Sequence, residues 1–234
     1  MEALKAGRRK FFRIVVKEGP IKSPQIKEVL EEALRRHVPL VEGSMEEIAQ
    51  TVGAEGHQGI VALVTSLPYT RFDTLEERLE KLDDPFVVLL DGVTDPRNFG
   101  AVIRSAEAMG AEAVIFPAHR AASYTPTAAK TSAGAGERMT LVQVPNIAEA
   151  VRKLREESGF YAVAFEGDAG ESVTRLPSGK LAIVMGDEGT GVRPLTRKRC
   201  DALVSIPMKG TVGSLNIASA ASIACFLAST RSKG

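Results

Sequence analysis

The sequence contains few of the residues that build metal centres and disulfide frameworks. Among its 234 residues there are two Cys, three His and no Trp. Cys200 and Cys225 lack the short paired spacing of a zinc site, and no His cluster lies near them. We therefore expect no metal site, and we expect both cysteines to be structural thiols in a reducing compartment.

Long hydrophobic runs are also missing. The longest apolar runs, such as Phe86 to Leu90, have the length of a strand and not of a membrane-spanning helix. Residues 1–10 carry no apolar segment of the kind found in secretion signals. These absences predict a cytoplasmic protein that does not associate with membranes.

An excess of charge of one sign is absent as well. Lys and Arg number 30 against 29 Asp and Glu, so no strong overall field attracts the chain to nucleic acid, membranes or acidic substrates. The residues are 44% hydrophobic and 25% charged, and the mean hydropathy is −0.01. This composition is typical of a globular protein and excludes disordered, fibrous and membrane classes. Any polyanion that the protein binds must be held by local patches.

Residues 1–66 predict a small α/β domain. Strand-like residues at 11–16 are followed by a helical pattern over 23–37 and a short apolar segment at 39–41. Ser44 and Glu47 have the spacing of a capping box before a further helix. The apolar run at 60–64 predicts another strand.

Residues 67–84 predict a linker that carries one short helix, capped by Thr74 and Glu77. Beyond it, apolar runs of strand length alternate with helical patterns, and we assign residues 85–234 to one domain. Strands are predicted at 86–90, 113–116, 141–144, 161–165, 181–185 and 203–206, and helices at 96–109, 125–133, 147–157 and 214–230. Near-continuous apolar strands separated by helices predict a parallel sheet covered on both faces, in an α/β fold.

The first loop that follows a predicted strand spans residues 91–100. Asp95-Pro96 is a good start for a helix, and this helix carries Arg97 and Arg104 on nearly one face, two turns apart. Two guanidinium groups on one stripe suit a phosphate or a sugar-phosphate backbone. A solvated helix face with ordinary arginines is the alternative.

The second loop spans residues 185–191 and contains three glycines within six residues. Glycine lets the backbone pass close to a ligand or to another segment, and Glu188 within the bend can accept hydrogen bonds from an amine or hydroxyl. The glycine order does not match the dinucleotide fingerprint. A tight structural turn is the alternative.

The third loop spans residues 206–216 and leads into a helix rich in Ala and Ser. Ser214 is a natural N-cap, and free amide groups at such a helix start can bind a carboxylate or a phosphate. Asn216 falls in the first turn, with its amide near the same opening. Small residues along the helix allow close packing against a neighbouring helix or within the core.

In this order, the three loops resemble the three motifs of the SpoU family of RNA ribose methyltransferases, also called the TrmH family. Residues 130–135 are also similar to that family, and residues 57–60 resemble the end of the ribosomal-protein-like substrate-binding domain of members that modify large-subunit rRNA. The resemblance covers nearly the whole chain. The matching residues are Asp91-Gly-Val-Thr-Asp-Pro-Arg-Asn98 with Gly100 and Arg104, Val184-Met-Gly-Asp-Glu188-Gly with Gly191, and Ile206-Pro-Met208 with Ser214-Leu-Asn216.

The resemblance implies a fold and a cofactor. It implies a small ribosomal-protein-like α/β domain over residues 1–66 and a parallel-sheet α/β methyltransferase domain of the SPOUT type over 85–234. That domain would be closed by a trefoil knot, which periodicity does not reveal. The implied cofactor is S-adenosylmethionine, held by backbone of the second and third loops. The corresponding residues here are Gly186, Ile206 and Leu215, with Met208 and Ser214 adjacent.

The implied reaction is methyl transfer to a ribose 2′-hydroxyl, with Arg104 as the central catalytic residue and Asn98, Glu188, Ser214 and Asn216 around it. The family casts this arginine as a base activated by an RNA phosphate. Because a guanidinium with a pKa above about 12 seldom loses a proton, we interpret Arg104 as holding the phosphate and the developing alkoxide together. Ser214 and Asn216 would orient Arg104 or the ribose, and Glu188 would shape its loop and contact cofactor or substrate.

The resemblance also implies partners. The expected substrate is a guanosine of large-subunit (23S) rRNA, with tRNA as the alternative, and the expected assembly is a homodimer through the knotted domain. Members with the extra domain usually begin with a Gly-x-His-x-Val segment that this chain lacks, so we expect either a trimmed domain or an incomplete sequence. A basic cluster near the N-terminus either contacts RNA phosphates or forms a solvated strand edge; its members are Arg8, Arg9, Lys10, Arg13 and Lys17.

Two other classes of function are open to the same sequence. A non-catalytic RNA-binding protein would use residues 1–66 to grip RNA and the second domain only to dimerise. The joint presence of Arg104, Glu188 and Asn216 argues against it. A nucleotide-dependent oxidoreductase is disfavoured because Gly-x-Gly-x-x-Gly occurs nowhere in the chain.

Overall fold

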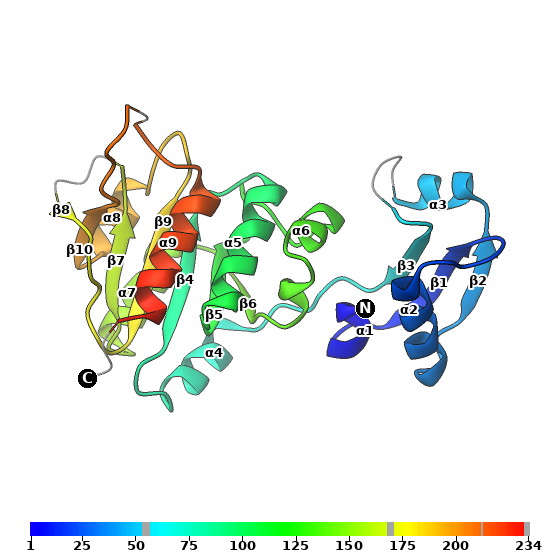
Figure 1. Ribbon diagram of the computed structural model, residues 1–234. Coiled ribbons are helices and arrows are strands. Elements are labelled where there is room, and N and C mark those ends of the chain that lie inside the picture. The colour runs from blue at the N-terminus through cyan, green and yellow to red at the C-terminus, as the bar shows by residue number, and fades with distance from the viewer. Residues whose placement is uncertain (53–56, 168–170, 212, 232–234) are drawn as a thin grey trace. The chain divides into compact units, whose positions relative to one another are not determined.

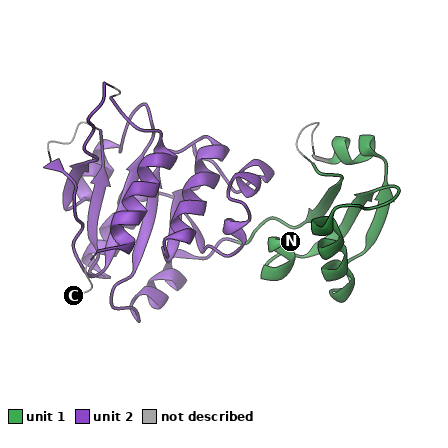
Figure 2. Cartoon of the chain, viewed as in Figure 1, with its two compact units in different colours: residues 1–68 green, residues 69–234 purple. Residues whose placement is uncertain are grey.

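The computed structural model describes residues 1–52, 57–167, 171–211 and 213–231. The chain forms two compact units, Met1–Pro68 and Tyr69–Gly234 (Figure 2). Each unit has its own sheet, three-stranded in the first and seven-stranded in the second. The functional boundaries 1–66, 67–84 and 85–234 stay a prediction.

The first unit is built around strand β1, which lies between a parallel β2 and an antiparallel β3 (Figure 1). The side chain of Ile14 in β1 is buried with Leu4 and Ala33. The predicted capping box is confirmed: the Ser44 N–H donates to Glu47 Oε2 at 2.8 Å, and the Glu47 N–H donates to Ser44 Oγ at 3.2 Å. The elements are α1 (Glu2–Ala6), β1 (Phe11–Lys17), α2 (Pro24–Arg35), β2 (Leu40–Gly43), α3 (Met45–Val52) and β3 (Ile60–Val64).

The second unit begins with α4 (Phe72–Leu79), which lies inside the segment that was predicted as a linker. Its Leu75 and Leu79 are buried in the core of this unit. The expected cap at Thr74 is wrong, because the helix begins at Phe72 with Arg71 as its N-cap. The remaining elements are β4 (Phe86–Asp91), α5 (Pro96–Ala108), β5 (Ala113–Pro117), α6 (Pro126–Thr131), η1 (Ala135–Glu137), β6 (Leu141–Val144), α7 (Ile147–Glu156), β7 (Tyr161–Phe165), β8 (Glu171–Ser172), β9 (Leu181–Gly186), α8 (Pro194–Arg199), β10 (Ala202–Ser205) and α9 (Ile217–Ser229).

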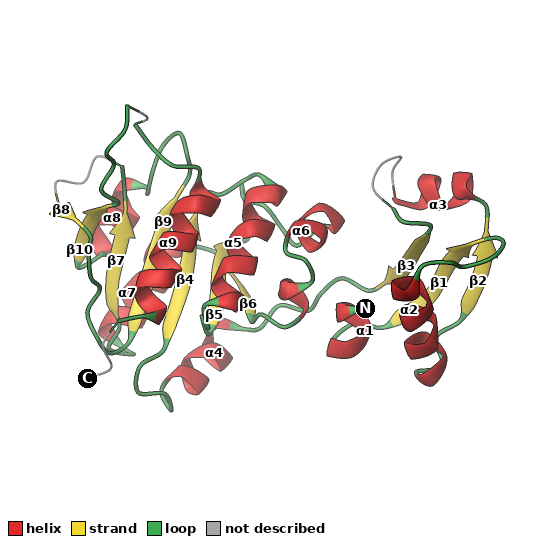
Figure 3. Cartoon of the chain, in the orientation of Figure 1, coloured by secondary structure: helices red, strands yellow, loops and turns green. Residues whose placement is uncertain are grey.

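The seven strands follow the order β6-β5-β4-β9-β7-β10-β8, and every pair between them is parallel. Helices α5 and α9 lie side by side on one face (Figure 3), where the hydroxyl groups of Ser105 and Ser222 are 2.7 Å apart. Helices α4 and α7 pack on the opposite face, where Val151 and Leu154 of α7 are fully buried. A parallel sheet with both faces covered confirms the predicted α/β class. The trefoil knot stays a prediction.

The strand order determines where in the second unit a ligand site is expected. Strand β9 inserts between β4 and β7, which precede it in the chain, so the order of the strands changes at this point of the sheet. Crevices outside the carboxyl ends of parallel strands at such a point are the usual ligand sites of α/β folds. The loops that follow β4, β7, β9 and β10 all leave this edge.

Candidate active site and cofactor pocket

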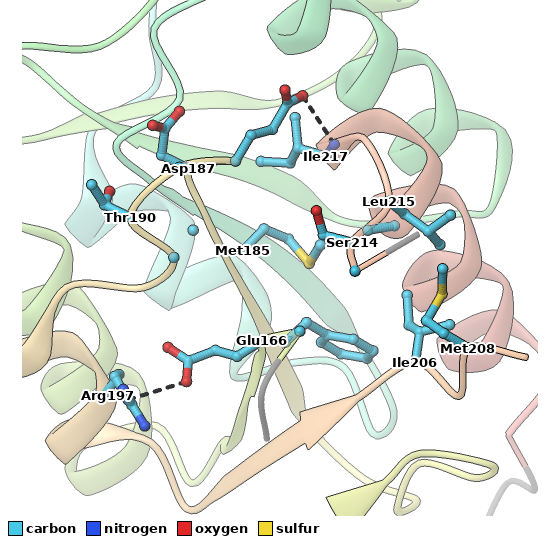
Figure 4. Close-up of a pocket in the computed structure, with 18 residues that line it drawn as sticks. Glu166, Met185, Asp187, Thr190, Arg197, Ile206, Met208, Ser214, Leu215 and Ile217 are labelled. Carbon is cyan, nitrogen blue, oxygen red and sulfur yellow. Dashed lines mark hydrogen bonds and ion pairs between the residues drawn. The ribbon is translucent and has the colours of Figure 1, made fainter. Parts of the chain in front are cut away.

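A cavity of about 430 Å³ lies at this edge of the sheet, within the size range of small-molecule sites. It is lined by the loops that follow β7, β9 and β10 and by the first turn of α9 (Figure 4). The structure brings all five predicted cofactor-binding residues to this one cavity, as Gly186, Ile206, Met208, Ser214 and Leu215.

The cavity has an apolar side and a polar side. Ile206, Met208 and Leu215 gather on one side, whereas Asp187, Thr190 and Arg197 lie on the other (Figure 4). An apolar wall suits a flat adenine ring, and the polar groups opposite suit a ribose or an amino-acid moiety. The residues present therefore fit an adenosine-containing cofactor such as S-adenosylmethionine.

Gly186 shapes the cavity by its lack of a side chain. The loop after β9 folds back through two hydrogen bonds, from the Asp187 N–H to the Gly191 carbonyl at 3.2 Å and from the Gly191 N–H to the Asp187 carbonyl at 2.9 Å. A Cβ atom on Gly186 would lie 2.0 Å from the Gly191 carbonyl carbon, which is impossible without moving the loop. Glycine is therefore required at residue 186, and its backbone lines the cavity.

The Glu188 carboxylate connects the three predicted motifs. Its Oε1 atom accepts hydrogen bonds from Asn98 Nδ2 at 2.9 Å and from Asn216 Nδ2 at 2.6 Å. The same oxygen accepts a third hydrogen bond from the Ile217 N–H at 3.2 Å. A carboxylate at the N-terminus of a helix is also favoured by the helix dipole. Glu188 therefore joins the loop after β9 to α5 and to α9.

Helix α9 begins at Ile217, and its N-cap is Asn216. The Asn216 Oδ1 accepts from the Ala218 N–H at 2.9 Å, and Asn216 Nδ2 donates to Asn98 Oδ1 at 3.1 Å as well as to Glu188. The expected N-cap role of Ser214 is wrong. Ser214 lies two residues before the cap, in the loop, and lines the cavity.

Asn98 lies in the first turn of α5, directly after the loop that follows β4. The Arg97 N–H donates to the carboxylate of the N-cap Asp95 at 2.9 Å, and Pro96 occupies the first turn, so the predicted helix start is confirmed. At the start of this loop, the buried Asp91 accepts from the Arg193 N–H at 3.0 Å. That hydrogen bond ties the loop to the residue that precedes α8.

Arg104 stands apart from the other predicted catalytic residues. It is exposed on α5, it does not line the cavity, and its side chain forms no hydrogen bond or ion pair with the part of the chain that the structure describes. Of the five predicted catalytic residues, the structure joins Asn98, Glu188 and Asn216 directly and places Ser214 at the cavity. The roles of all five stay predictions.

Two charged lining residues, Glu166 and Arg197, had no place in the sequence prediction. Glu166 follows β7 directly, and its carboxylate lies 3.2 Å from the Nε atom of Arg197 on α8. The only available signal was position, because Glu166 stands at the carboxyl end of a predicted strand. No spacing rule links it to Arg197.

The cysteines do not line the cavity. Burial raises the pKa of the Cys200 and Cys225 thiols to about 12, so both are protonated at neutral pH. Within residues 1–52, 57–167, 171–211 and 213–231 there is no group of three or more His, Cys, Asp or Glu side chains that could hold a metal ion. No helix in those ranges is both long and apolar enough to cross a membrane.

Comparison with protein-family models decides the family. Residues 85–226 match the SpoU rRNA Methylase family, and residues 1–70 match the RNA 2'-O ribose methyltransferase substrate binding domain. The chain belongs to the SpoU rRNA methylase family. The methylase match contains the whole Asn98–Glu188–Asn216 cluster and all five cavity residues named above.

Named relatives within the SpoU family are similar over most of the chain. The chain is 45% identical to the Escherichia coli 23S rRNA (guanosine-2'-O-)-methyltransferase RlmB over 171 residues, which is 73% of this chain and 70% of that protein. It is 40% identical to the Vibrio cholerae protein of the same name, over 85% of this chain and 80% of that one. Among solved structures, the SpoU methyltransferase AviRb from Streptomyces viridochromogenes, in complex with the cofactor AdoMet, matches with a TM-score of 0.79 and 28% identity, over 97% of this chain and 85% of that chain.

Proposed function

We propose that this SpoU protein transfers a methyl group from S-adenosylmethionine to a ribose 2′-hydroxyl of RNA, and that its substrate is a guanosine of 23S rRNA. The observation that carries the proposal is the Asn98–Glu188–Asn216 cluster beside a cavity that fits the cofactor. The 45% identity to a 23S rRNA (guanosine-2'-O-)-methyltransferase supports the choice of substrate.

The cavity residues hold and orient the cofactor, which supplies an electrophilic methyl group on its sulfonium when bound. The backbone of Gly186 and the side chains of Ile206 and Leu215 form the adenine wall, with Met208 beside them. Ser214 places a hydroxyl at the same cavity, where it orients the ribose of the substrate. Positioning is the main task of the protein, because the sulfonium already provides a good leaving group.

Arg104 binds the RNA phosphate and stabilises the negative charge that develops on the ribose oxygen. Its exposed guanidinium lies on the same helix as Asn98, whose amide is fixed by Glu188. A guanidinium stabilises an alkoxide without giving up its own proton, so the proton of the hydroxyl leaves through water.

Residues 1–66 recognise the RNA. The side chains of Arg13 and Lys17 are exposed on β1 and are suited to phosphate contacts. Arg8 and Arg9 precede β1 and fix the end of the first unit to this segment. Their guanidinium groups donate to the carbonyls of Pro68 at 3.3 Å and Thr65 at 3.5 Å, respectively. The match of residues 1–70 to a substrate-binding family model supports this role.

The protein acts as a homodimer through its second unit, in the cytoplasm where rRNA is modified. Ile223 and Phe226 support the dimer: they lie one turn apart on α9 with 37% and 53% of their surface exposed. Light scattering at micromolar concentration tests this, with twice the chain mass expected. A monomeric mass would overturn the dimer.

Calorimetric titration with S-adenosylmethionine tests the proposed function against a non-catalytic RNA-binding role. We expect heat of binding for S-adenosylmethionine and none for NAD. Absence of cofactor binding would favour the non-catalytic role, and binding of NAD would favour an oxidoreductase. Transfer of radiolabelled methyl groups to purified 23S rRNA and to purified tRNA then separates the two RNA substrates, and we expect label in 23S rRNA.

A further inference from the structure

Glu166 is a carboxylate at the cofactor cavity that the catalytic cluster does not use. It is the first residue after β7, and its N–H donates to the Val204 carbonyl of β10 at 2.9 Å, which fixes its backbone. Only 11% of its side chain is exposed. The side chain lies at the cavity and points toward Arg197 (Figure 4).

The two oxygens of this carboxylate have different surroundings. Oε2 lies 3.2 Å from Arg197 Nε, whereas Oε1 lies on the side where a side chain of residue 191 would be if that residue were not glycine. A Cβ atom added at Gly191 would lie 3.6 Å from Oε1, so the glycine leaves the space beside this oxygen open. Gly191 also has a φ of +64°, a conformation that other residues adopt only with strain. One oxygen is therefore held by a cation, and the other lies beside a glycine that also lines the cavity.

A nearly buried carboxylate requires donors to offset its loss of hydration. Arg197 balances the charge of Glu166, so a further cation in the cavity would gain little from the carboxylate. Neutral hydroxyl donors suit the remaining oxygen better, because a carboxylate accepts several hydrogen bonds and these are stronger than neutral ones. The chemistry of Oε1 therefore favours a hydroxyl ligand.

The place of Glu166 relative to the apolar wall identifies that hydroxyl. Phe165, the preceding residue, lines the cavity together with Ile206, so Glu166 directly follows an apolar lining residue. In an adenosine-containing ligand, the group bonded to adenine is a ribose with two neighbouring hydroxyls. Acidic side chains near the ends of parallel strands accept hydrogen bonds from ribose hydroxyls in other α/β folds.

We propose that Glu166 accepts hydrogen bonds from the ribose hydroxyls of the adenosine part of the methyl donor, and that Arg197 is the positioning residue that orients its carboxylate. This inference rests on the proposed use of S-adenosylmethionine. It adds a specificity determinant after β7 to the cofactor-binding residues proposed in the loops after β9 and β10.

Equilibrium binding of three ligands to the full chain tests the inference. The ligands are S-adenosylhomocysteine, its 2′,3′-dideoxy analogue, and 5′-methylthioadenosine, which has the ribose but no amino-acid end. We expect Glu166→Gln to weaken S-adenosylhomocysteine and 5′-methylthioadenosine each by about tenfold, and the dideoxy analogue by less than twofold. Arg197→Met should lower the ratio of the affinity for S-adenosylhomocysteine to the affinity for its dideoxy analogue. A general loss of stability would not change this ratio.

The matched control is Glu149→Gln, which removes another Glu–Arg pair, with Arg152, outside the cavity. It should leave all three affinities unchanged, and circular dichroism verifies that each variant is folded. Equal weakening of the ribose and dideoxyribose ligands by Glu166→Gln would overturn the inference. So would weakening of S-adenosylhomocysteine alone, which would assign Glu166 to the amino-acid end. Failure of the unmodified protein to bind S-adenosylhomocysteine would overturn the proposed function as well.

Discussion

Glu188 Oε1 accepts a 2.6 Å hydrogen bond from Asn216 Nδ2, which joins the loop after β9 to the first turn of α9. The two residues are brought together by the strand order, because β9 ends beside β4 and α9 packs against α5. Asn98 at the start of α5 donates to the same oxygen. One carboxylate oxygen therefore positions elements from all three family motifs.

Removing the Glu188 carboxylate should separate these elements. Glu188→Ala leaves Asn98 Nδ2, Asn216 Nδ2 and the Ile217 N–H without their common acceptor, and we expect kcat to fall by about 100-fold. Stability should fall by only about 1 kcal/mol, because Glu188 and Asn216 are exposed.

Glu188→Gln is the matched variant, because its side-chain carbonyl still accepts hydrogen bonds but carries no charge. It should recover part of the lost kcat, as measured by single-turnover methyl transfer to 23S rRNA. Equal kcat for the Ala and Gln variants would show that the acceptor geometry is unimportant.

Asn216 and Ser214 should contribute differently to the free energy of unfolding, because only Asn216 caps α9. Asn216→Ala removes the N-cap acceptor of the Ala218 N–H and should lower the free energy of unfolding by about 1 kcal/mol. Ser214→Ala should change it by less than about 0.5 kcal/mol, because Ser214 lies outside the helix. Urea denaturation measures both, and a larger loss for Ser214→Ala would contradict the observed cap.

Arg104 is predicted to act on RNA and not on the cofactor. Arg104→Lys keeps the positive charge but loses the planar fork, so kcat at saturating RNA should fall by about 100-fold or more. Affinity for S-adenosylhomocysteine should remain within twofold, because Arg104 does not line the cavity. Near-native turnover of this variant would show that the assigned role is wrong.

Asp201 contributes stability that depends on pH. Its Oδ2 accepts hydrogen bonds from Arg155 Nε and from the Ala162 N–H, both at 2.8 Å, and Arg155 Nη2 donates to Oδ1. Burial raises the pKa of Asp201, but the hydrogen bonds from Arg155 and Ala162 lower it more, so the pKa lies below its ordinary 3.8. The unfolded state therefore takes up the proton first as the pH falls.

This stabilising contribution is present above about pH 4 and is lost as the pH falls through the lowered pKa of the folded state. Asp201→Asn should lower stability at pH 7 by about 1–3 kcal/mol and flatten its dependence on pH below 4. Asp83→Asn is the control, because Asp83 is exposed. Parallel acid profiles for Asp201→Asn and the unmodified protein, from thermal denaturation at several pH values, would contradict the prediction.

Local sequence signals predicted the strands well. The observed bounds of β3, β6 and β7 coincide with the predicted 60–64, 141–144 and 161–165, because each is an apolar run that ends at polar or turn-forming residues. The six-residue α8 was missed, since one and a half turns give too little periodicity to detect.

Features that depend on tertiary contacts could not be predicted from the residues alone. Ser214 and Asn216 are both good capping residues, and only Asn216 also bonds to Glu188 and Asn98. The pairing of Glu166 with Arg197 depends on β7 and β9 being neighbours in the sheet, which no local pattern encodes. The three motifs were recognised as a set by their resemblance to a family, whereas each motif taken singly had a structural alternative.

Ribose methylation mapped across total RNA from cells with and without this gene tests the proposed function in the cell. We expect one guanosine of 23S rRNA to lose its 2′-O-methyl group, and we expect the unmodified gene to restore it whereas the Arg104→Ala variant does not. An unchanged 23S rRNA profile, or a loss confined to tRNA, would show that the protein does not methylate 23S rRNA.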